Sequence, residues 1–220
     1  MILNLNKPIG WTSFDVCKKI KGITKERKVG HAGTLDPFAK GVLIIGTGSD
    51  TKSLSLISNQ TKSYVASITL GAETDTLDID GKIVLKKNVP KLKEKQIHQV
   101  FTTFIGDYYQ IPPMYSAKKV KGRKLYEYAR KNIVIDRNPV LVKIYSINLE
   151  NFNSESISFS VACSKGTYIR VLGKDIAEKL ETVGYLSMLT RTAVGDFKIN
   201  ESLSITDFEI EWKSSTQKRI

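Results

Sequence analysis

The stretch SISFSVAC, residues 156–163, alternates strictly between small residues and larger apolar ones. Successive side chains of a strand point to opposite faces, so this pattern places Ile157, Phe159, Val161 and Cys163 on one face. A strand with one covered face is typical of an antiparallel sheet. We therefore expect a half-buried strand at the centre of the fold.

Helices and further strands are expected on both sides of this strand. Residues 171–183 form an amphipathic pattern that ends before Gly184, and residues 92–104 form another that Gly106 stops. We expect short helices capped by Ser13 and Asp50 and one around residues 125–129, with strands at 2–5, 42–46 and 64–70. Helices and strands do not alternate regularly, which predicts an α/β domain of the α+β type on a mixed sheet.

The composition fits a folded chain. It has 220 residues, of which 41% are hydrophobic, and no apolar run approaches the roughly 20 residues that span a bilayer. The N-terminus lacks the apolar core of a signal peptide. Cys17 and Cys163 have neither metal-ligand nor redox spacing, so we expect reduced core thiols in a cytoplasmic protein.

The charge is strongly positive. Lysine and arginine number 34 against 22 acidic residues, for a formal net charge of +12. Composition alone fits either a polyanionic partner or a lysine-rich surface. The segment KKVKGRKLYEYARK, residues 118–131, has seven basic residues and interleaves Tyr126 and Tyr128, and this clustering favours RNA binding.

A glycine-rich segment, GHAGTLDPFAKGVLIIGTG at residues 30–48, carries His31 and Asp36. Its five glycines indicate tight turns or close backbone approach to a ligand. Pro37 biases Asp36 toward extended geometry in a turn. The residues alone favour a turn aspartate that bonds its own backbone over a catalytic carboxylate, and leave both open.

A second candidate segment is SKGTYIR, residues 164–170, directly after the alternating strand. If it continues as a strand, Tyr168 and Arg170 lie on one face and could bind a planar, anionic substrate. The alternative is a core tyrosine and a rim arginine.

Other motifs are weak. GTGSDT, residues 46–51, has Thr51 where a dinucleotide fingerprint needs its last glycine. His31 and His98 form no zinc pattern with the cysteines, and we expect His98 on a helix surface. TDTLDIDG, residues 74–81, lacks calcium-loop spacing. We expect neither a metal nor a cofactor.

Together the ordered blocks closely resemble the bacterial tRNA pseudouridine-55 synthases, the TruB family, over roughly residues 1–200. The blocks are NLNKPIGWTS (4–13), GHAGTLDPFAKGVL (30–43), KSYVASITLG (62–71), ETDTLDIDG (73–81), QIPPMYSAKKVKGRKLYEYAR (110–130), CSKGTYIR (163–170) and SMLTRTAVGDF (187–197).

The resemblance implies a role for each matching residue. Asp36 corresponds to the catalytic aspartate, which Arg170 pairs with, and Tyr64 to the tyrosine that stacks on the target base. Tyr168 corresponds to a substrate-binding tyrosine. The remaining matches are His31 beside the bound RNA and Leu189 lining the base pocket.

The resemblance also implies the organisation of the chain. Residues 1–200 would form the catalytic domain, with a mixed, mostly antiparallel sheet flanked by helices. Residues 110–132 would form an RNA-gripping thumb, in which we expect Lys118, Lys119, Lys121 and Arg123 to bind RNA. Residues 201–220 would be a short tail in place of the family's PUA domain, and we expect its polar end, WKSSTQKRI at residues 212–220, to be frayed. We expect binding centred on the tRNA T-arm by a monomer without an obligatory protein partner.

The implied reaction moves the uracil link from N1 to C5 without net gain or loss, so it needs no redox cofactor. A lone carboxylate in a closed pocket suits a reaction that excludes water. The alternative is a tRNA-binding or folding module without activity, and a nucleotide-cofactor enzyme ranks third.

Overall fold

The computed structural model describes residues 1–120 and 122–217. It divides into two compact units, one made of Met1–Tyr64 with Thr190–Ile220 and the other of Val65–Leu189. Strands β4 (Lys62–Leu70) and β12 (Gly184–Val194) contribute residues to both units.

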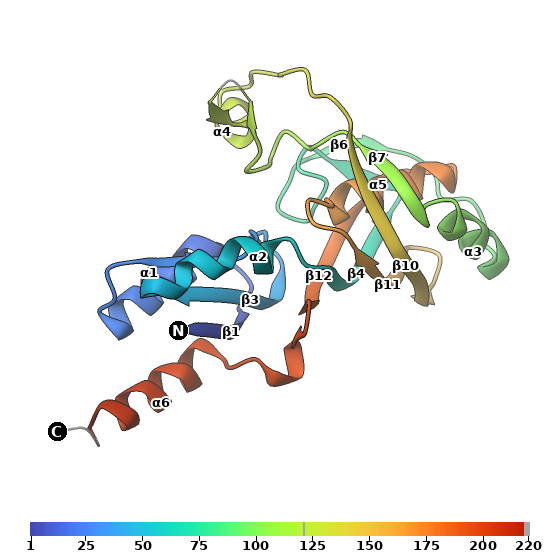
Figure 1. Ribbon diagram of the computed structural model, residues 1–220. Helices are drawn as coiled ribbons and strands as arrows, with labels where there is room; N and C mark the ends of the chain where they lie inside the picture. Colours follow the sequence, from blue (N-terminus) through green and yellow to red (C-terminus); the bar gives the residue numbers. More distant parts are fainter. Residues whose placement is uncertain (121, 218–220) are drawn as a thin grey trace. The chain divides into compact units, whose positions relative to one another are not determined.

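The first unit is built around β3 (Lys40–Thr47), drawn near the blue end of the colour scale in Figure 1. Strand β1 (Ile2–Lys7) pairs with it antiparallel from Ile2↔Gly46 to Lys7↔Gly41, and β2 (Val29–His31) pairs antiparallel as well. Thr190 and Arg191 of β12 run parallel to the start of β3, and β13 (Phe197–Lys198) pairs with the end of β12.

Helices cover both faces of this sheet. Apolar residues of α1 (Ser13–Thr24) and α6 (Ile205–Gln217) share one core cluster with Leu5 and Leu43. The opposite face of β3 packs with the 3-10 helix η1 (Gly48–Ser53), α2 (Leu54–Ser58) and the turn η2 (Ile199–Glu201).

The start of α1 is fixed one residue earlier than predicted. Thr12, not Ser13, caps the helix, because Asp15 three residues later completes a capping box with Thr12. The Ser13 hydroxyl is buried and both accepts from the Leu35 N–H (2.9 Å) and donates to the Leu35 carbonyl (3.1 Å). Ser13 therefore fastens α1 to the loop that contains Asp36.

The second unit contains the alternating strand. In it the strand order is β12, β4, β11 (Ser156–Cys163), β10 (Val140–Phe152) and β7 (Gly106–Gln110). Strand β10 is antiparallel to both β11 and β7. The predicted face is confirmed, because Ile157, Phe159, Val161 and Cys163 are all buried.

Two helices cover this buried face, with α3 (Glu94–Thr102) against β10 and α5 (Ile169–Lys179). The Phe101 and Phe159 ring centroids lie 5.8 Å apart. Both units thus confirm a mixed, mostly antiparallel sheet flanked by helices.

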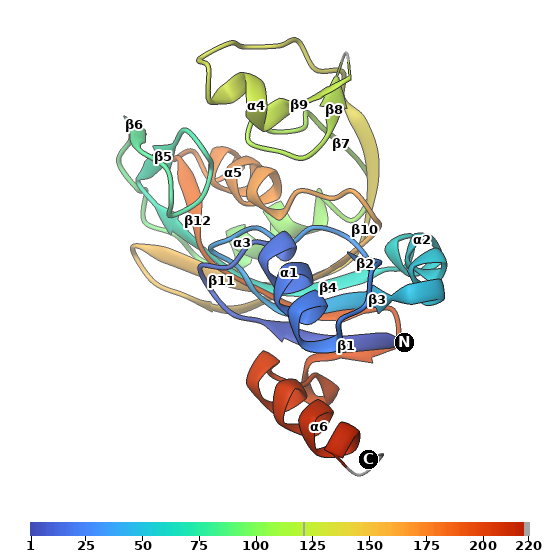
Figure 2. The same cartoon turned by 90° about the vertical axis from the view of Figure 1, so that its left-hand side faces the viewer.

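Two hairpins complete the second unit. One joins β5 (Ala72–Thr74) and β6 (Ile83–Lys86), and the other joins β8 (Lys119–Val120) and β9 (Arg123–Lys124). Figure 2 shows β8, β9 and α4 (Leu125–Ala129) gathered in one small lobe. The short helix predicted at residues 125–129 is confirmed.

Three local predictions were wrong. Residues 212–217 are not frayed, because they continue α6, which the buried Ile205 and Phe208 anchor, and residues 218–220 lie outside the described residues. Asp50 does not cap a helix through Ile57, since it pairs with the N-terminal amine at 2.7 Å. Helix α5 ends at Lys179, four residues early, and Glu181 follows in a left-handed conformation.

Among residues 1–120 and 122–217, no helix is long and apolar enough to cross a membrane.

Candidate active site

Asp36 lies in the loop between β2 and β3 of the first unit. It is half-buried, and its carbonyl accepts a hydrogen bond from the Ala39 N–H at 3.1 Å, which closes a turn. The neighbours Leu35 and Phe38 are buried. The expected turn geometry at Asp36 is confirmed.

Lys7, at the end of β1, is fully buried beneath this loop. Its ammonium donates to the carbonyls of Pro8 (2.9 Å), Trp11 (2.6 Å) and Pro37 (3.3 Å). Burial lowers the pKa of Lys7 to about 8, while the nearby Asp36 carboxylate acts in the opposite direction. Lys7 therefore holds the backbone next to Asp36 and is coupled to its charge.

Arg191, at the end of β12, is a second buried cation beside the loop. Its guanidinium donates to the carbonyls of Val42 (2.7 Å), Gly33 (3.2 Å) and Thr34 (3.4 Å). The fork of N–H groups thus joins the backbone before Asp36 to the backbone after it. Gly41 permits the close approach, because a Cβ there would lie 2.2 Å from the Arg191 carbonyl oxygen.

His31 ends β2 and is half-buried. Burial, and then the charge of Arg191, lowers the pKa of His31 below its ordinary value, so the imidazole is neutral near pH 7. Its Nδ1 is buried without a hydrogen-bond partner among the described residues.

Tyr64 is 8% exposed and shares the buried face of β4 with Lys62. The Lys62 ammonium donates to the carbonyls of Ser58 and Gln60, at 2.6 Å each. A Cβ on Gly33 would lie about 4 Å from both Lys62 and Arg191, so two cationic side chains approach the start of the Asp36 loop.

In the second unit, Tyr168 and Arg170 begin a helix. The expectation of a second strand carrying Tyr168 and Arg170 was wrong, since Tyr168 is the N-cap residue of α5 and Arg170 lies in its first turn. The cause lies 58 residues earlier in the chain. The buried Gln110 side chain accepts from the Tyr168 N–H (2.9 Å) and donates to the Tyr168 carbonyl (3.0 Å).

Arg170 is 3% exposed and is held by the acidic loop of residues 73–81. Its guanidinium donates to the carbonyls of Thr76 (2.7 Å) and Tyr115 (2.8 Å) and lies 3.4 Å from the Asp78 carboxylate. Asp36 and Arg170 belong to different units, so their pairing stays a prediction.

Asp78 is a further candidate residue, which sequence reasoning missed. It is 5% exposed, and its Oδ1 accepts from the Thr76 hydroxyl (2.6 Å) and the Asp80 N–H (3.1 Å). The available signal was the acidic loop itself, which lies in a block of the family resemblance but has no calcium-loop spacing. Lys7 and Arg191 were missed as well, although both lie in blocks of the family resemblance.

The other predicted residues are placed as follows. Leu189 is buried on β12. Lys119 and Arg123 are exposed on the β8–β9 hairpin and Lys118 is half-buried beside it, whereas Lys121 lies outside the described residues. The Tyr126 ring lies 5.4 Å from the Lys124 ammonium and 5.3 Å from the Arg130 guanidinium. Within residues 1–120 and 122–217 no cluster of three potential metal ligands occurs.

Comparison with solved structures agrees with this architecture. A Cbf5-Nop10-Gar1 complex matches with a TM-score of 0.79 and 28% identity, covering all of this chain and 56% of that chain. An H/ACA RNP bound to a substrate RNA containing 2'-deoxyuridine matches with a TM-score of 0.74 and 26% identity, and 55% of that chain is covered. This chain therefore spans about half the length of these solved chains.

Sequence comparison identifies the family. The tRNA pseudouridine synthase B of Caldanaerobacter subterraneus subsp. tengcongensis is 46% identical over 217 residues, which cover 98% of this chain and 76% of that protein. The tRNA pseudouridine synthase B of Dehalococcoides mccartyi strain BAV1 is 42% identical over 208 residues, which cover 94% of this chain and 69% of that protein. The model of the TruB family pseudouridylate synthase N-terminal domain matches residues 21–169. The chain belongs to the TruB family of pseudouridylate synthases.

Proposed function

We propose that this chain isomerises uridine 55 in the T-loop of tRNA to pseudouridine, with Asp36 as its catalytic carboxylate. Membership of the TruB family and the names of its relatives support tRNA pseudouridine synthesis as the reaction. The observation that carries the residue assignment is the fixed position of Asp36. Two buried cations, Lys7 and Arg191, hold the backbone on both sides of it.

Such a loop suits a reaction in which one carboxylate must meet a sugar carbon at a fixed place. In the reaction the N1–C1′ bond breaks, the uracil turns, C5 bonds to C1′, the C5 proton leaves and N1 takes up a proton. Reactant and product are isomers, so no electrons are exchanged with a cofactor. Asp36 acts either as the nucleophile at C1′ or as the base that takes a proton from the sugar.

The remaining residues have proposed roles around the uracil. Tyr64 stacks on the base, which is worth roughly 1–3 kcal/mol. Tyr168 contacts the base, Arg170 pairs with Asp36, and Asp78 keeps the guanidinium in place. His31 lies beside the RNA and Leu189 lines the pocket.

We also propose how the chain is organised. Residues 1–200 serve as the catalytic domain, in the cytoplasm and as a monomer. Residues 110–132, with Lys118, Lys119, Lys121 and Arg123, grip the T-arm through its phosphates. The target uridine must leave its stack at a cost of a few kcal/mol, which these contacts help to offset.

The test is to map pseudouridine in unmodified tRNA, and in its isolated T-arm stem-loop, after incubation with the chain. Pseudouridine at position 55 of both RNAs, with release of tritium from C5-labelled uridine, is the expected result. A tRNA-binding module without activity would release no tritium. Modification at another position would reject the assignment of the target.

A further inference from the structure

One face of α1 carries an exposed aromatic ring in line with two lysines, and a third lysine caps the end of the helix. Phe14, Lys18 and Lys21 follow one another at intervals of four and three residues, which places them on one side of the helix, and Lys25 follows as the C-cap residue in a left-handed conformation. All four are exposed, and the Phe14 side chain is 72% exposed. We call these four residues the α1 stripe. The opposite side of α1 buries Val16, Cys17 and Ile20.

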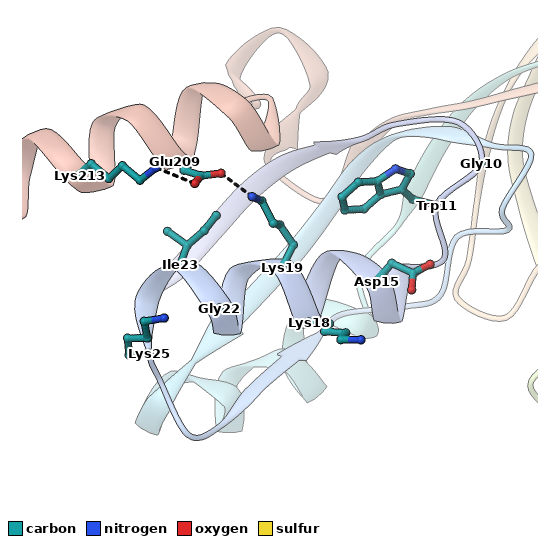
Figure 3. A pocket seen from close by; sticks show the side chains of 10 residues that line it. All are labelled: Gly10, Trp11, Asp15, Lys18, Lys19, Gly22, Ile23, Lys25, Glu209 and Lys213. Carbon is teal, nitrogen blue, oxygen red and sulfur yellow. Dashed lines mark ion pairs between the residues drawn. The ribbon is translucent and has the colours of Figure 1, made fainter.

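The lysines of the stripe differ from their neighbour Lys19. Figure 3 shows Lys19 and Ile23 pointing toward α6, whereas Lys18 points away from it. Lys19 pairs with Glu209 at 2.5 Å. Within residues 1–120 and 122–217, Lys18, Lys21 and Lys25 form no ion pair with a carboxylate. Packing of α1 therefore does not account for the lysines of the stripe.

The surface next to the stripe is concave and contains a second aromatic residue. Lys18 and Lys25 line a hollow of about 810 Å³ together with Trp11, Ile23 and the Lys19–Glu209 ion pair that joins α1 to α6. Nearby Asp15 is engaged in the cap of α1, where its carboxylate accepts from the Thr12 N–H at 2.8 Å. Cations combined with accessible aromatic rings suit a nucleic-acid strand, because phosphates and bases are then bound together.

The stripe begins at the candidate catalytic loop. Ser13 precedes Phe14 and is hydrogen-bonded in both directions to Leu35, the residue before Asp36. From Phe14 to Lys21 the helix rises about 10 Å. A strand that leaves the Asp36 loop along α1 would therefore meet several positions at which a phosphate and a lysine can pair.

We propose that the α1 stripe binds the RNA backbone beside the target nucleotide, with the three lysines on phosphates and Phe14 against a base or sugar. This inference rests on the proposed function, because it takes Asp36 as the place where RNA is modified. It adds a contact surface in the first unit to the lysines of residues 110–132.

The first test removes the charges. Lys18→Gln, Lys21→Gln and Lys25→Gln combined should weaken binding of unmodified tRNA about tenfold at roughly 0.1 M salt. The slope of log affinity against log salt should flatten by two or more, because each phosphate contact contributes about 0.9 on a duplex. The matched control changes Lys87, Lys91 and Lys95, three exposed lysines of the second unit, to Gln. The control should bind within about twofold of the wild type.

The second test removes the ring. Phe14→Ala should weaken tRNA binding about fivefold or more and leave the salt slope unchanged, because stacking does not release counterions. Circular dichroism and thermal melting of each variant verify the fold. The proposal would be overturned if the salt slope of the variant with Lys18, Lys21 and Lys25 all changed to Gln equalled that of the wild type. It would also be overturned if the control variant lost as much tRNA affinity as that variant.

A third experiment tests whether the α1 stripe binds RNA or an anionic lipid surface. Vesicles of phosphatidylserine and phosphatidylcholine are titrated with wild type and triple variant. Stripe-dependent vesicle binding with unaltered tRNA affinity would overturn the proposal in favour of a lipid surface. Absence of tritium release by the wild-type chain would instead refute the proposed function, whatever the binding results.

Discussion

At the scale of single residues, the candidate site depends on buried cations that bond to backbone carbonyls. Lys7 and Arg191 each reach three carbonyl groups around the Asp36 loop. A buried charge is tolerated only where its hydrogen bonds are satisfied. The two cations therefore need these carbonyls as acceptors, and the same hydrogen bonds hold the backbone of the loop in place.

Arg191→Lys tests the geometry of this arrangement while it keeps the charge. A lysine offers one ammonium and cannot bridge Val42 and Gly33 as the guanidinium fork does. We expect kcat to fall about a hundredfold, because misplacement by about 1 Å can cost that much. Single-turnover kinetics on tRNA measure the rate, with Arg27→Lys on the exposed surface of the same unit as the control. A rate within threefold of wild type would contradict a positioning role.

Lys7 predicts how stability depends on pH. Its pKa is about 8 in the folded chain and about 10.5 when unfolded, so between these values the unfolded state binds more protons. Stability must then rise with pH over this window, by on the order of 3 kcal/mol from this group. Urea unfolding measures the free energy of unfolding at pH 7.5 and at pH 10. Between these two pH values it should increase less for Lys7→Met than for the wild type. Equal rises would show that Lys7 has an ordinary pKa in the fold.

At the scale of elements, helix α5 places two candidate site residues in its first turn. Gln110 from β7 bonds both backbone groups of Tyr168 at the N-cap, and Arg170 follows two residues later. The helix start is thus fixed by a strand distant in sequence.

Gln110→Met should loosen this start and lower kcat about tenfold with a smaller change in KM, since the residue positions the site rather than binding RNA. The expected tenfold decrease in kcat is estimated from the two buried hydrogen bonds, which contribute roughly 1 kcal/mol each. Only part of this energy stabilises the transition state relative to the bound substrate. Steady-state kinetics measure the two parameters, with Gln99→Met on the exposed side of α3 as the control. An increase in KM alone would show that Gln110 affects RNA affinity instead.

Local patterns predicted several elements well and long-range contacts poorly. The alternation at residues 156–163 and the period of α3 follow from side chains close in sequence. The placement of Tyr168 does not, because it depends on Gln110. Helix α6 could have been found from Ile205, Phe208 and Trp212, which lie on one helical face.

At the scale of the whole molecule, the residues implied by the family resemblance divide between the two units. Asp36, His31 and Tyr64 lie in the first unit, and Tyr168, Arg170 and Leu189 in the second. Arg191 bonds to Gly33, 158 residues earlier, a contact that no local pattern reveals. The sequence therefore indicated the chemistry of the Asp36 loop, while the buried cations that hold it became visible only in the fold.

The central claim is that one carboxylate performs the reaction. Asp36→Asn keeps the size of the side chain and removes its charge, so the chain should fold and bind tRNA as the wild type does. The control is Asp196→Asn, which changes an exposed aspartate in the same unit. The decisive measurement is tritium release from C5-labelled tRNA under single-turnover conditions. We predict no release above background for Asp36→Asn and a wild-type rate for Asp196→Asn, whereas an Asp36→Asn rate within tenfold of wild type would contradict the account.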